Sequence, residues 1–301
     1  MWFIIAYLMD LVYDYPLYRP PSESQSLIFQ VTLGCSFNKC SFCNMYRTKE
    51  YSERSMTEID REIDLMANYY PETKRIFLAD GDALNLETTK LIHILSKIRK
   101  KFNNLERISS YSMPKNLLEK PHDELKSLEQ AGLDMVYLGI ESGNDTVLKK
   151  ITKGATSKMI VDSCKKAKDT GFILSCMIIL GLGGKNYSQV HAEDTSKIIN
   201  EIEPNYLGAL TLYMEPAIEQ EFYTKFKEPF IPLDDLGVLD ELKSLINGIG
   251  VTENVIFRAN HASNVYSIGG TLPKDKPAIL QKIAYLKEHP ELLKPKILRR
   301  F

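Results

Sequence analysis

Short apolar runs alternate with helix-period segments along most of the chain. The runs are rich in β-branched or aromatic residues, as is typical of strands buried in a parallel sheet. Between them, apolar residues recur every three or four positions, which predicts amphipathic helices. The predicted strands are Leu27–Leu33, Arg75–Ala79, Arg107–Tyr111, Met135–Ile140, Phe172–Leu180 and Tyr206–Tyr213. The alternation predicts an α/β fold, a partial (β/α)6 TIM-like barrel with functional loops at the carboxyl ends of its strands.

The regular alternation stops after Tyr213, where prolines mark a connecting segment. Beyond it we expect a helix near Asp234–Asn247, an extended stretch Asn254–Arg258 and a helix near Lys274–Glu288. The predicted organisation is an N-terminal extension over residues 1–25, the barrel over residues 26–215 and a small C-terminal extension over residues 216–301. Whether this last part adds a strand, caps the barrel or contacts substrate stays open.

The overall charge does not indicate a particular macromolecular partner, although a local basic patch stays open. The chain has 38 Lys+Arg against 39 Asp+Glu, so its overall charge favours neither nucleic acid nor an anionic membrane as the main partner. The apolar run Trp2–Met9 stops at Asp10 and is too short to span a bilayer. We interpret it as a buried N-terminal segment of a cytoplasmic protein.

Three of the five cysteines, Cys35, Cys40 and Cys43, lie within nine residues, directly after the first predicted strand. This spacing makes a poor disulfide framework and a good set of metal ligands in a reducing compartment. Thiolates suit iron–sulfur clusters or zinc. Three thiolates can hold three irons of a [4Fe-4S] cubane and leave the fourth iron open to the amino and carboxylate groups of S-adenosylmethionine. The alternative is a zinc site completed by a distant His or carboxylate.

The loop, with Phe42 just before its last cysteine, resembles the cluster motif of the radical S-adenosylmethionine (radical SAM) superfamily. Asp80–Ala83, Leu138–Gly143 and Ile179–Gly184 follow the second, fourth and fifth strands, where that superfamily has its cofactor-contacting loops. The resemblance covers about residues 26–215. It is nearest to the branch with anaerobic coproporphyrinogen oxidase-like and methylthiotransferase-like radical domains. Zinc would not require these loops, so the cluster is the favoured interpretation.

One departure concerns the first gap of the motif. Four residues separate Cys35 from Cys40, whereas the superfamily usually has three. Because the ligating thiols lie on a loop, an additional residue can bulge without moving them apart.

The resemblance implies a [4Fe-4S] cluster on Cys35, Cys40 and Cys43, and S-adenosylmethionine beside it. The residues expected to contact the cofactors are Phe42, Gly81, Asp82, Ser112, Glu141, Ser142 and Gly181. Asp82 would pair with the methionine ammonium, and its alternative role is a helix N-cap.

Glu141 and Ser142 would accept hydrogen bonds from the ribose diol. The alternative cap role at this turn suits Asn144 better. Ser112 would contact the methionine carboxylate or the sugar, or is an ordinary turn residue. Gly181 would let the backbone approach the adenine ring.

We expect residues that contact the substrate to lie in the C-terminal extension. A concentration of polar residues from Arg258 to Asn264 follows the extended stretch, and it suggests a site wall with Asn260, and with His261 as donor or general acid. A turn with a surface histidine is an equal alternative. Tyr213, at the end of the sixth strand, points toward the same rim.

The resemblance therefore implies an enzyme that reductively cleaves S-adenosylmethionine to a 5′-deoxyadenosyl radical, which takes hydrogen from a small-molecule substrate. An electron donor such as flavodoxin or ferredoxin is the expected partner, with no membrane or nucleic acid. The alternatives are an RNA- or peptide-modifying radical enzyme and, in a different class, a zinc-stabilised binding protein.

Overall fold

The computed structural model describes residues 13–299, so the apolar run Trp2–Met9 lies outside the described residues. Eight strands form the main sheet, in the order β1-β4-β5-β6-β7-β8-β9-β10. All neighbouring pairs are parallel except β9 and β10, which are antiparallel. The strands are β1 (Leu27–Gln30), β4 (Arg75–Ala79), β5 (Arg107–Ser112), β6 (Met135–Glu141), β7 (Ile173–Leu180), β8 (Tyr206–Thr211), β9 (Val255–Ala259) and β10 (Ile268–Leu272).

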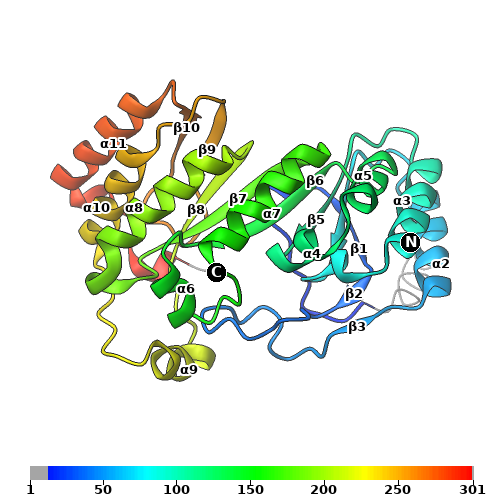
Figure 1. The fold of residues 1–301 in the computed structure, drawn as a ribbon, viewed down its shortest axis with the longest axis horizontal. Coiled ribbons are helices and arrows are strands. Elements are labelled where there is room, and N and C mark those ends of the chain that lie inside the picture. Colours follow the sequence, from blue (N-terminus) through cyan, green and yellow to red (C-terminus); the bar gives the residue numbers. More distant parts are fainter. Residues whose placement is uncertain (1–12, 300–301) are drawn as a thin grey trace.

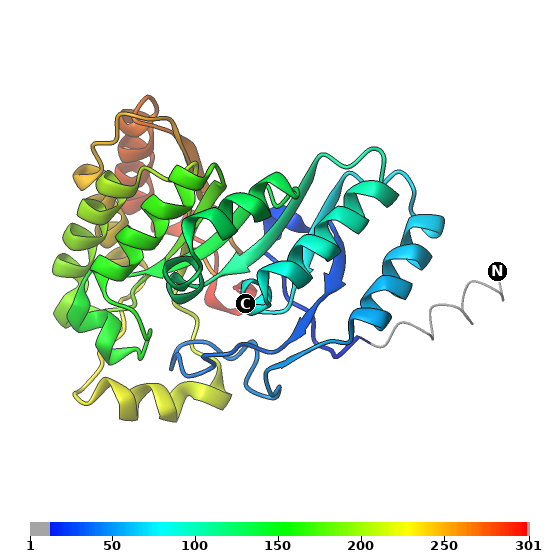
Figure 2. The same cartoon turned by 45° about the vertical axis from the view of Figure 1, so that its right-hand side comes forward.

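Helices cover the outer face of this sheet (Figures 1 and 2). They are α2 (Met56–Tyr69), α3 (Thr88–Lys101), α4 (Pro114–Glu119), α5 (His122–Gln130), α6 (Asp145–Lys150), α7 (Ser157–Thr170), α8 (Gly184–Ile202), α10 (Asp235–Gly248) and α11 (Lys276–Glu288). Helix α9 (Pro216–Phe226) lies apart from this layer, at the bottom of both views. The short 3₁₀ turns are η1 (Pro21–Glu23), η2 (Ala83–Asn85), η3 (Pro290–Leu292) and η4 (Lys296–Leu298). A separate two-stranded sheet is formed by β2 (Thr32–Leu33) and β3 (Ser52–Glu53). No helix within residues 13–299 is both long and apolar enough to cross a membrane.

The two faces of the sheet bury different side chains. The large core lies between sheet and helices and includes Val136, Leu138 and Ile140 of β6. The alternate residues Met135 and Tyr137 belong to a smaller cluster on the concave face. Side chains of a strand point alternately to the two faces, so one run of residues serves both cores.

The C-terminal extension lengthens the sheet. β9 pairs in parallel with β8, and β10 then pairs with β9, so the residues after 215 add two strands. Helix α10 packs against α8, and α11 packs against α10 and β10. Because β1 and β10 are the two edge strands of the order, the sheet is a partial barrel, and the predicted fold class is confirmed.

Candidate functional site

The cysteine loop follows β2 and is fastened by one arginine. Gly34 makes the turn into the loop at φ +67°, a left-handed conformation that favours glycine. The Arg47 guanidinium donates to the carbonyl oxygens of Asn38 (3.0 Å), Cys40 (2.6 Å) and Cys43 (3.0 Å). A planar fork of donors can satisfy several acceptors at once, so this one side chain fixes the path of the backbone between the thiols.

The four-residue first gap contains a left-handed residue, Asn38, at φ +40°. Asparagine tolerates this conformation better than most residues, and its side-chain amide donates to the carbonyl of Tyr46 at 2.7 Å. The neighbouring Phe37 packs on Gly154, where a Cβ would lie 2.4 Å from the ring. The longer gap is therefore held by contacts of its own.

A half-buried lysine that sequence reasoning missed lies against the loop. The Lys153 ammonium is 2.9 Å from Glu141 Oε1. The backbone carbonyl oxygen of Lys153 lies 4.0 Å from Cys40 Sγ. Burial works against the charged form of Lys153, but the negative charge of Glu141 and the hydrogen bond to it act in the opposite direction, and the pKa of Lys153 is raised. No periodic signal marks this position, because the lysine follows a short helix in an irregular turn.

Burial shapes the chemistry of the thiols. It raises the pKa of Cys35 and Cys43, and that of Cys40 to about 12. Without a cation these thiols are therefore neutral at pH 7, and a bound metal centre has to displace their protons. The positive charge of the neighbouring Lys153 favours a centre that carries net negative charge.

The loop after β4 contributes Asp82, which is fully buried. Its Oδ2 accepts a hydrogen bond from the Ser36 hydroxyl, next to Cys35, whereas its Oδ1 has no partner among residues 13–299. Burial raises the pKa of Asp82, while hydrogen bonds from Ser36 and Asn116 oppose that shift. Asp82 precedes η2 without making a side-chain cap bond. Its free oxygen is suited to a cationic ligand.

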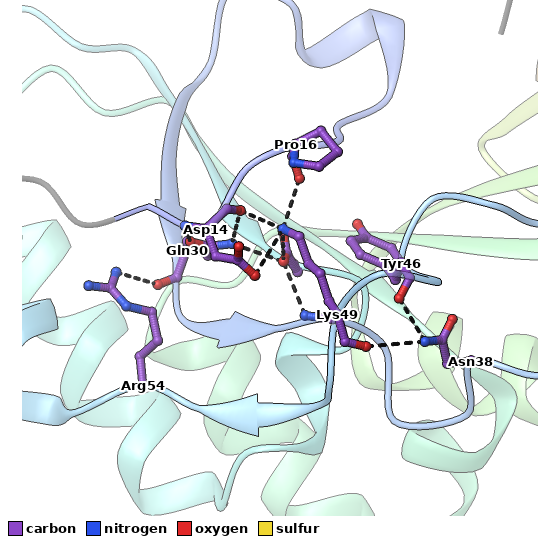
Figure 3. Close-up of polar contacts among 9 residues, drawn as sticks. Asp14, Pro16, Gln30, Asn38, Tyr46, Lys49 and Arg54 are labelled. Carbon is purple, nitrogen blue, oxygen red and sulfur yellow. Dashed lines mark hydrogen bonds and ion pairs between the residues drawn. The ribbon is translucent and has the colours of Figure 1, made fainter.

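The same loop is anchored by an ion pair with Lys49, whose surroundings are shown in Figure 3. Lys49 bonds to Asp80 Oδ2 at 2.9 Å, and it also donates to the carbonyl of Pro16 at 2.8 Å. Gly81 lies against the Tyr46 ring, where a Cβ would lie 2.5 Å from Cε2. Residues before the predicted barrel thus help to hold the loop after β4.

Glu141 ends β6 at φ +63°, and its side chain lies over Gly139, where a Cβ would be 1.9 Å from Oε1. Ser142 is fully buried, and its hydroxyl lies 2.7 Å from His191 Nδ1 on α8. The cap of α6 is Asn144, as the alternative interpretation proposed, since its side chain accepts from Val147 N.

The glycine turn after β7 is held from the C-terminal extension. Gly181 has φ +79°, and its N–H donates to Glu241 Oε1 of α10 at 2.6 Å. Glu241 is buried, its Oε2 has no partner among the described residues, and its Oε1 lies 3.6 Å from His191 Nε2. Sequence reasoning missed Glu241, because it lies in an ordinary amphipathic helix far along the chain.

Two other predicted contacts have protein partners. Ser112 is buried and donates to the carbonyl of Tyr137 at 3.3 Å. Phe42 is half-buried and packs against the main core.

The predicted site residues of the C-terminal extension differ in how far they are buried. Asn264 is buried and bonds Thr211 Oγ1 (2.9 Å), so it fastens the end of β8. His261 Nδ1 is 2.9 Å from Ser263 Oγ, and burial, with the charge of Lys294, lowers the pKa of His261.

Asn260 is exposed, and Tyr213 keeps 38% of its surface exposed. Glu215, two residues on, accepts from Asn44 of the cysteine loop at 2.7 Å. The end of β8 and the cysteine loop are therefore neighbours.

The donor set fits an iron–sulfur cluster with a cationic, chelating ligand. Three thiols share one loop, and the buried Asp82 Oδ1 beside that loop lacks a partner. Among residues 13–299, no three or more His, Cys, Asp or Glu side chains are placed to hold a single metal ion.

Known proteins resemble this chain in sequence and in fold. The sequence profile described as "Radical SAM superfamily" matches residues 29–193, which is more than half of the chain. A 4'-phospho-dehydrooxetanocin synthase of Priestia megaterium is 24% identical over 225 residues, covering 67% of this chain and 30% of that protein. The heme chaperone HemW of Bacillus subtilis is 24% identical over 183 residues, covering 60% of this chain and 47% of HemW.

Solved structures share the fold. Coproporphyrinogen III oxidase (HemN) from Escherichia coli, described as a radical SAM enzyme, superposes with a TM-score of 0.56 at 18% identity, over 74% of this chain and 52% of HemN. Methylthiotransferases also match in sequence, so the expected branch is confirmed. The matches cover only 30% to 50% of the length of the first three curated relatives.

Proposed function

The chain belongs to the radical SAM superfamily and is a radical SAM enzyme that uses a [4Fe-4S] cluster and S-adenosylmethionine; from this premise we propose that it reductively cleaves S-adenosylmethionine and abstracts hydrogen from a small-molecule substrate. When bound, the cluster and S-adenosylmethionine together supply one-electron cleavage of a sulfonium bond and a 5′-deoxyadenosyl radical. The protein supplies their placement and the electrostatic surroundings.

We propose that Cys35, Cys40 and Cys43 hold the cluster, with Arg47 fixing the loop that presents them. The half-buried Lys153, paired with Glu141, would offset negative charge at this centre. Because the Lys153 side chain is mostly shielded from water, its ammonium attracts negative charge more strongly than it would in bulk solvent.

The unpartnered Asp82 Oδ1 is the observation that carries the proposal. An isolated buried carboxylate oxygen is costly, and it becomes favourable when a positively charged ligand pairs with it. The ammonium of a bound amino acid has this chemistry, and Asp82 is tied through Ser36 to the cysteine loop.

The other loops would orient the nucleoside part of the ligand. Glu141 would accept hydrogen bonds from the ribose hydroxyls, and Ser142 would hold that turn through His191. Gly181 and Ser112 would complete the wall, with Phe42 packed behind the last thiol. Gly81 leaves room for the Tyr46 ring beneath the loop after β4.

The substrate would enter at the carboxyl ends of β8 and β9. We propose that Tyr213, Asn260 and His261 face it, with His261 as a donor. The proposed electron source is a small carrier such as flavodoxin or ferredoxin. The clustered loop cysteines, which are typical of metal ligands and not of disulfides, favour the cytoplasm as the compartment of this protein.

The decisive experiment is an anaerobic assay for 5′-deoxyadenosine after iron–sulfur reconstitution and chemical reduction. We expect slow release without substrate, faster release with the correct metabolite, and none from Cys40→Ala. If the reconstituted protein carries a full cluster and yet never releases 5′-deoxyadenosine under reducing conditions, the proposal fails.

A further inference from the structure

One row of residues crosses the concave face of the sheet from β6 to β10. Adjacent strands pair in register through Gly139, Met177, Gly208, Arg258 and Gly269. Residues paired across neighbouring strands project from the same face. Arg258 therefore has a glycine beside it on both neighbouring strands.

The arginine points into the concavity, away from the helices. Phe257 and Ala259, which flank Arg258 along β9, are buried in the core beneath the helices. Since successive side chains of a strand alternate between faces, Arg258 lies on the opposite side. Tyr206 on β8, which faces the same way, packs against the small concave-face cluster around Tyr137.

A hollow of about 330 Å³ opens beside this arginine. Its lining residues are Arg258, Asn260, Ser267, Ile268, Gly269 and Gly270. The lining offers guanidinium, amide and hydroxyl donors and contains no carboxylate. Arg258 Nη1 donates to the carbonyls of Phe257 (2.7 Å) and Gly270 (3.1 Å), and within residues 13–299 no acidic side chain pairs with it.

Two glycines of the row make room for charged groups. A Cβ at Gly269 would lie 3.0 Å from Arg258 Cδ and 3.3 Å from its Nη1, so the arginine lies directly over this glycine. At the other end of the row, a Cβ at Gly139 would lie 1.9 Å from Glu141 Oε1 and 3.0 Å from Lys153 Nζ. Three strand spacings separate Gly139 from Arg258, which is about 14 Å along the sheet. A small molecule can span that distance.

We propose that Arg258, together with Asn260, binds an anionic group of the substrate, a carboxylate or a phosphate monoester, and so holds the substrate across the concave face toward Glu141 and Lys153. A guanidinium without an acidic partner is suited to such groups because it can donate two parallel hydrogen bonds to them. The inference rests on the proposed function, and it assigns the substrate class to small anionic metabolites.

The test uses the reconstituted holoenzyme and two simple probes. Arginine residues are modified with phenylglyoxal, and the rates at Arg258 and Arg75 are compared by peptide mass mapping in inorganic phosphate, in acetate and in chloride at equal ionic strength. Arg75 is an exposed arginine at the opposite end of the sheet, at the start of β4, and serves as the internal control. We expect several-fold slower modification at Arg258 in phosphate or acetate, and no change at Arg75.

The pattern of protection identifies the source of the anionic group. Protection by phosphate alone indicates a phosphate monoester, and protection by both probes indicates that a carboxylate suffices. Equal rates in all three salts, or equal protection at Arg75, would overturn the site.

Two variants test the geometry. Asn260→Ala should raise the phosphate concentration for half-protection about three- to tenfold, because it removes one neutral donor. Gly269→Ala keeps the charge but pushes a methyl group against Arg258 Cδ, so protection should fall while Arg258 stays reactive. Unchanged protection in both variants would refute the placement.

A 5′-deoxyadenosine assay on the same preparation separates the two proposals. Absence of 5′-deoxyadenosine would count against the proposed function. Absence of protection would count against the anion site alone.

Discussion

The five cysteines lie in two environments. Cys35, Cys40 and Cys43 share a partly exposed loop, whereas Cys164 and Cys176 are fully buried, with their sulfur atoms 4.0 Å apart. The second pair packs in the main core between α7 and β7, as small apolar groups do.

Replacing any one of the loop cysteines with Ala should reduce bound iron and sulfide to near zero after reconstitution, because each thiol is expected to ligate a different iron of one cluster. Iron and sulfide analysis per chain measures this. Cys164→Ala is the matched control and should bind iron as the wild type does. Equal iron loss in the control would show that the ligand set is wrong.

Asp82→Asn should weaken binding of S-adenosylmethionine about ten- to a hundredfold, because it removes a charge-assisted contact of about 1.5–3 kcal/mol. Cofactor titration of the cluster-loaded protein measures the change. The control is Asp169→Asn, an exposed carboxylate near the end of α7. Unchanged cofactor affinity in Asp82→Asn, with a full cluster, would refute the role given to the loop after β4.

At the scale of elements, two helices hold the turns after β6 and β7. His191 of α8 bonds Ser142 at one turn and the Ile179 carbonyl (3.1 Å) before the other. Glu241 of α10 accepts from Gly181 N. A helix from the C-terminal extension therefore positions a turn that the resemblance assigns to the adenine.

Glu241→Ala should weaken S-adenosylmethionine binding about tenfold without lowering cluster content, because the Gly181 N–H loses its acceptor. Parallel titrations of cofactor and iron test this. Glu241→Gln keeps an acceptor oxygen and should restore most of the affinity. A merely structural role would instead lower the melting temperature of Glu241→Ala and leave the affinity of the folded protein unchanged.

At the scale of the molecule, the tail and the barrel share one sheet and one core. Phe257 of β9 is fully buried in the same core cluster as Leu207 of β8 and Leu239 of α10. A shared core predicts that the two parts unfold together.

Phe257→Ala should lower the free energy of unfolding by about 3–5 kcal/mol, the usual range for a large aromatic residue in a packed core. Denaturant titrations followed by circular dichroism and by tyrosine fluorescence should give coincident transitions at a lower midpoint. Tyr285→Ala on α11 removes an aromatic ring that is 46% exposed and should change the midpoint little. Two separate transitions would indicate that the tail folds independently.

The six predicted barrel strands and the cysteine loop follow from local features. Apolar runs such as Met135–Ile140 and Phe172–Leu180 correspond to β6 and β7, because buried parallel strands need nearly continuous apolar residues. The thiol spacing was equally visible, because all three ligands lie in one short loop.

The sequence by itself thus determined the barrel class and the family, and it predicted the cofactor loops, since each depends on neighbouring residues of the chain. Tertiary structure decided which residues far apart in sequence meet: Lys153 beside Cys40, Glu241 at Gly181, and Arg258 between two glycines of neighbouring strands. It also decided that the tail extends the sheet. The physical reason is that such contacts join residues far apart in sequence, and their partners depend on strand order and register, which no local pattern of polarity encodes.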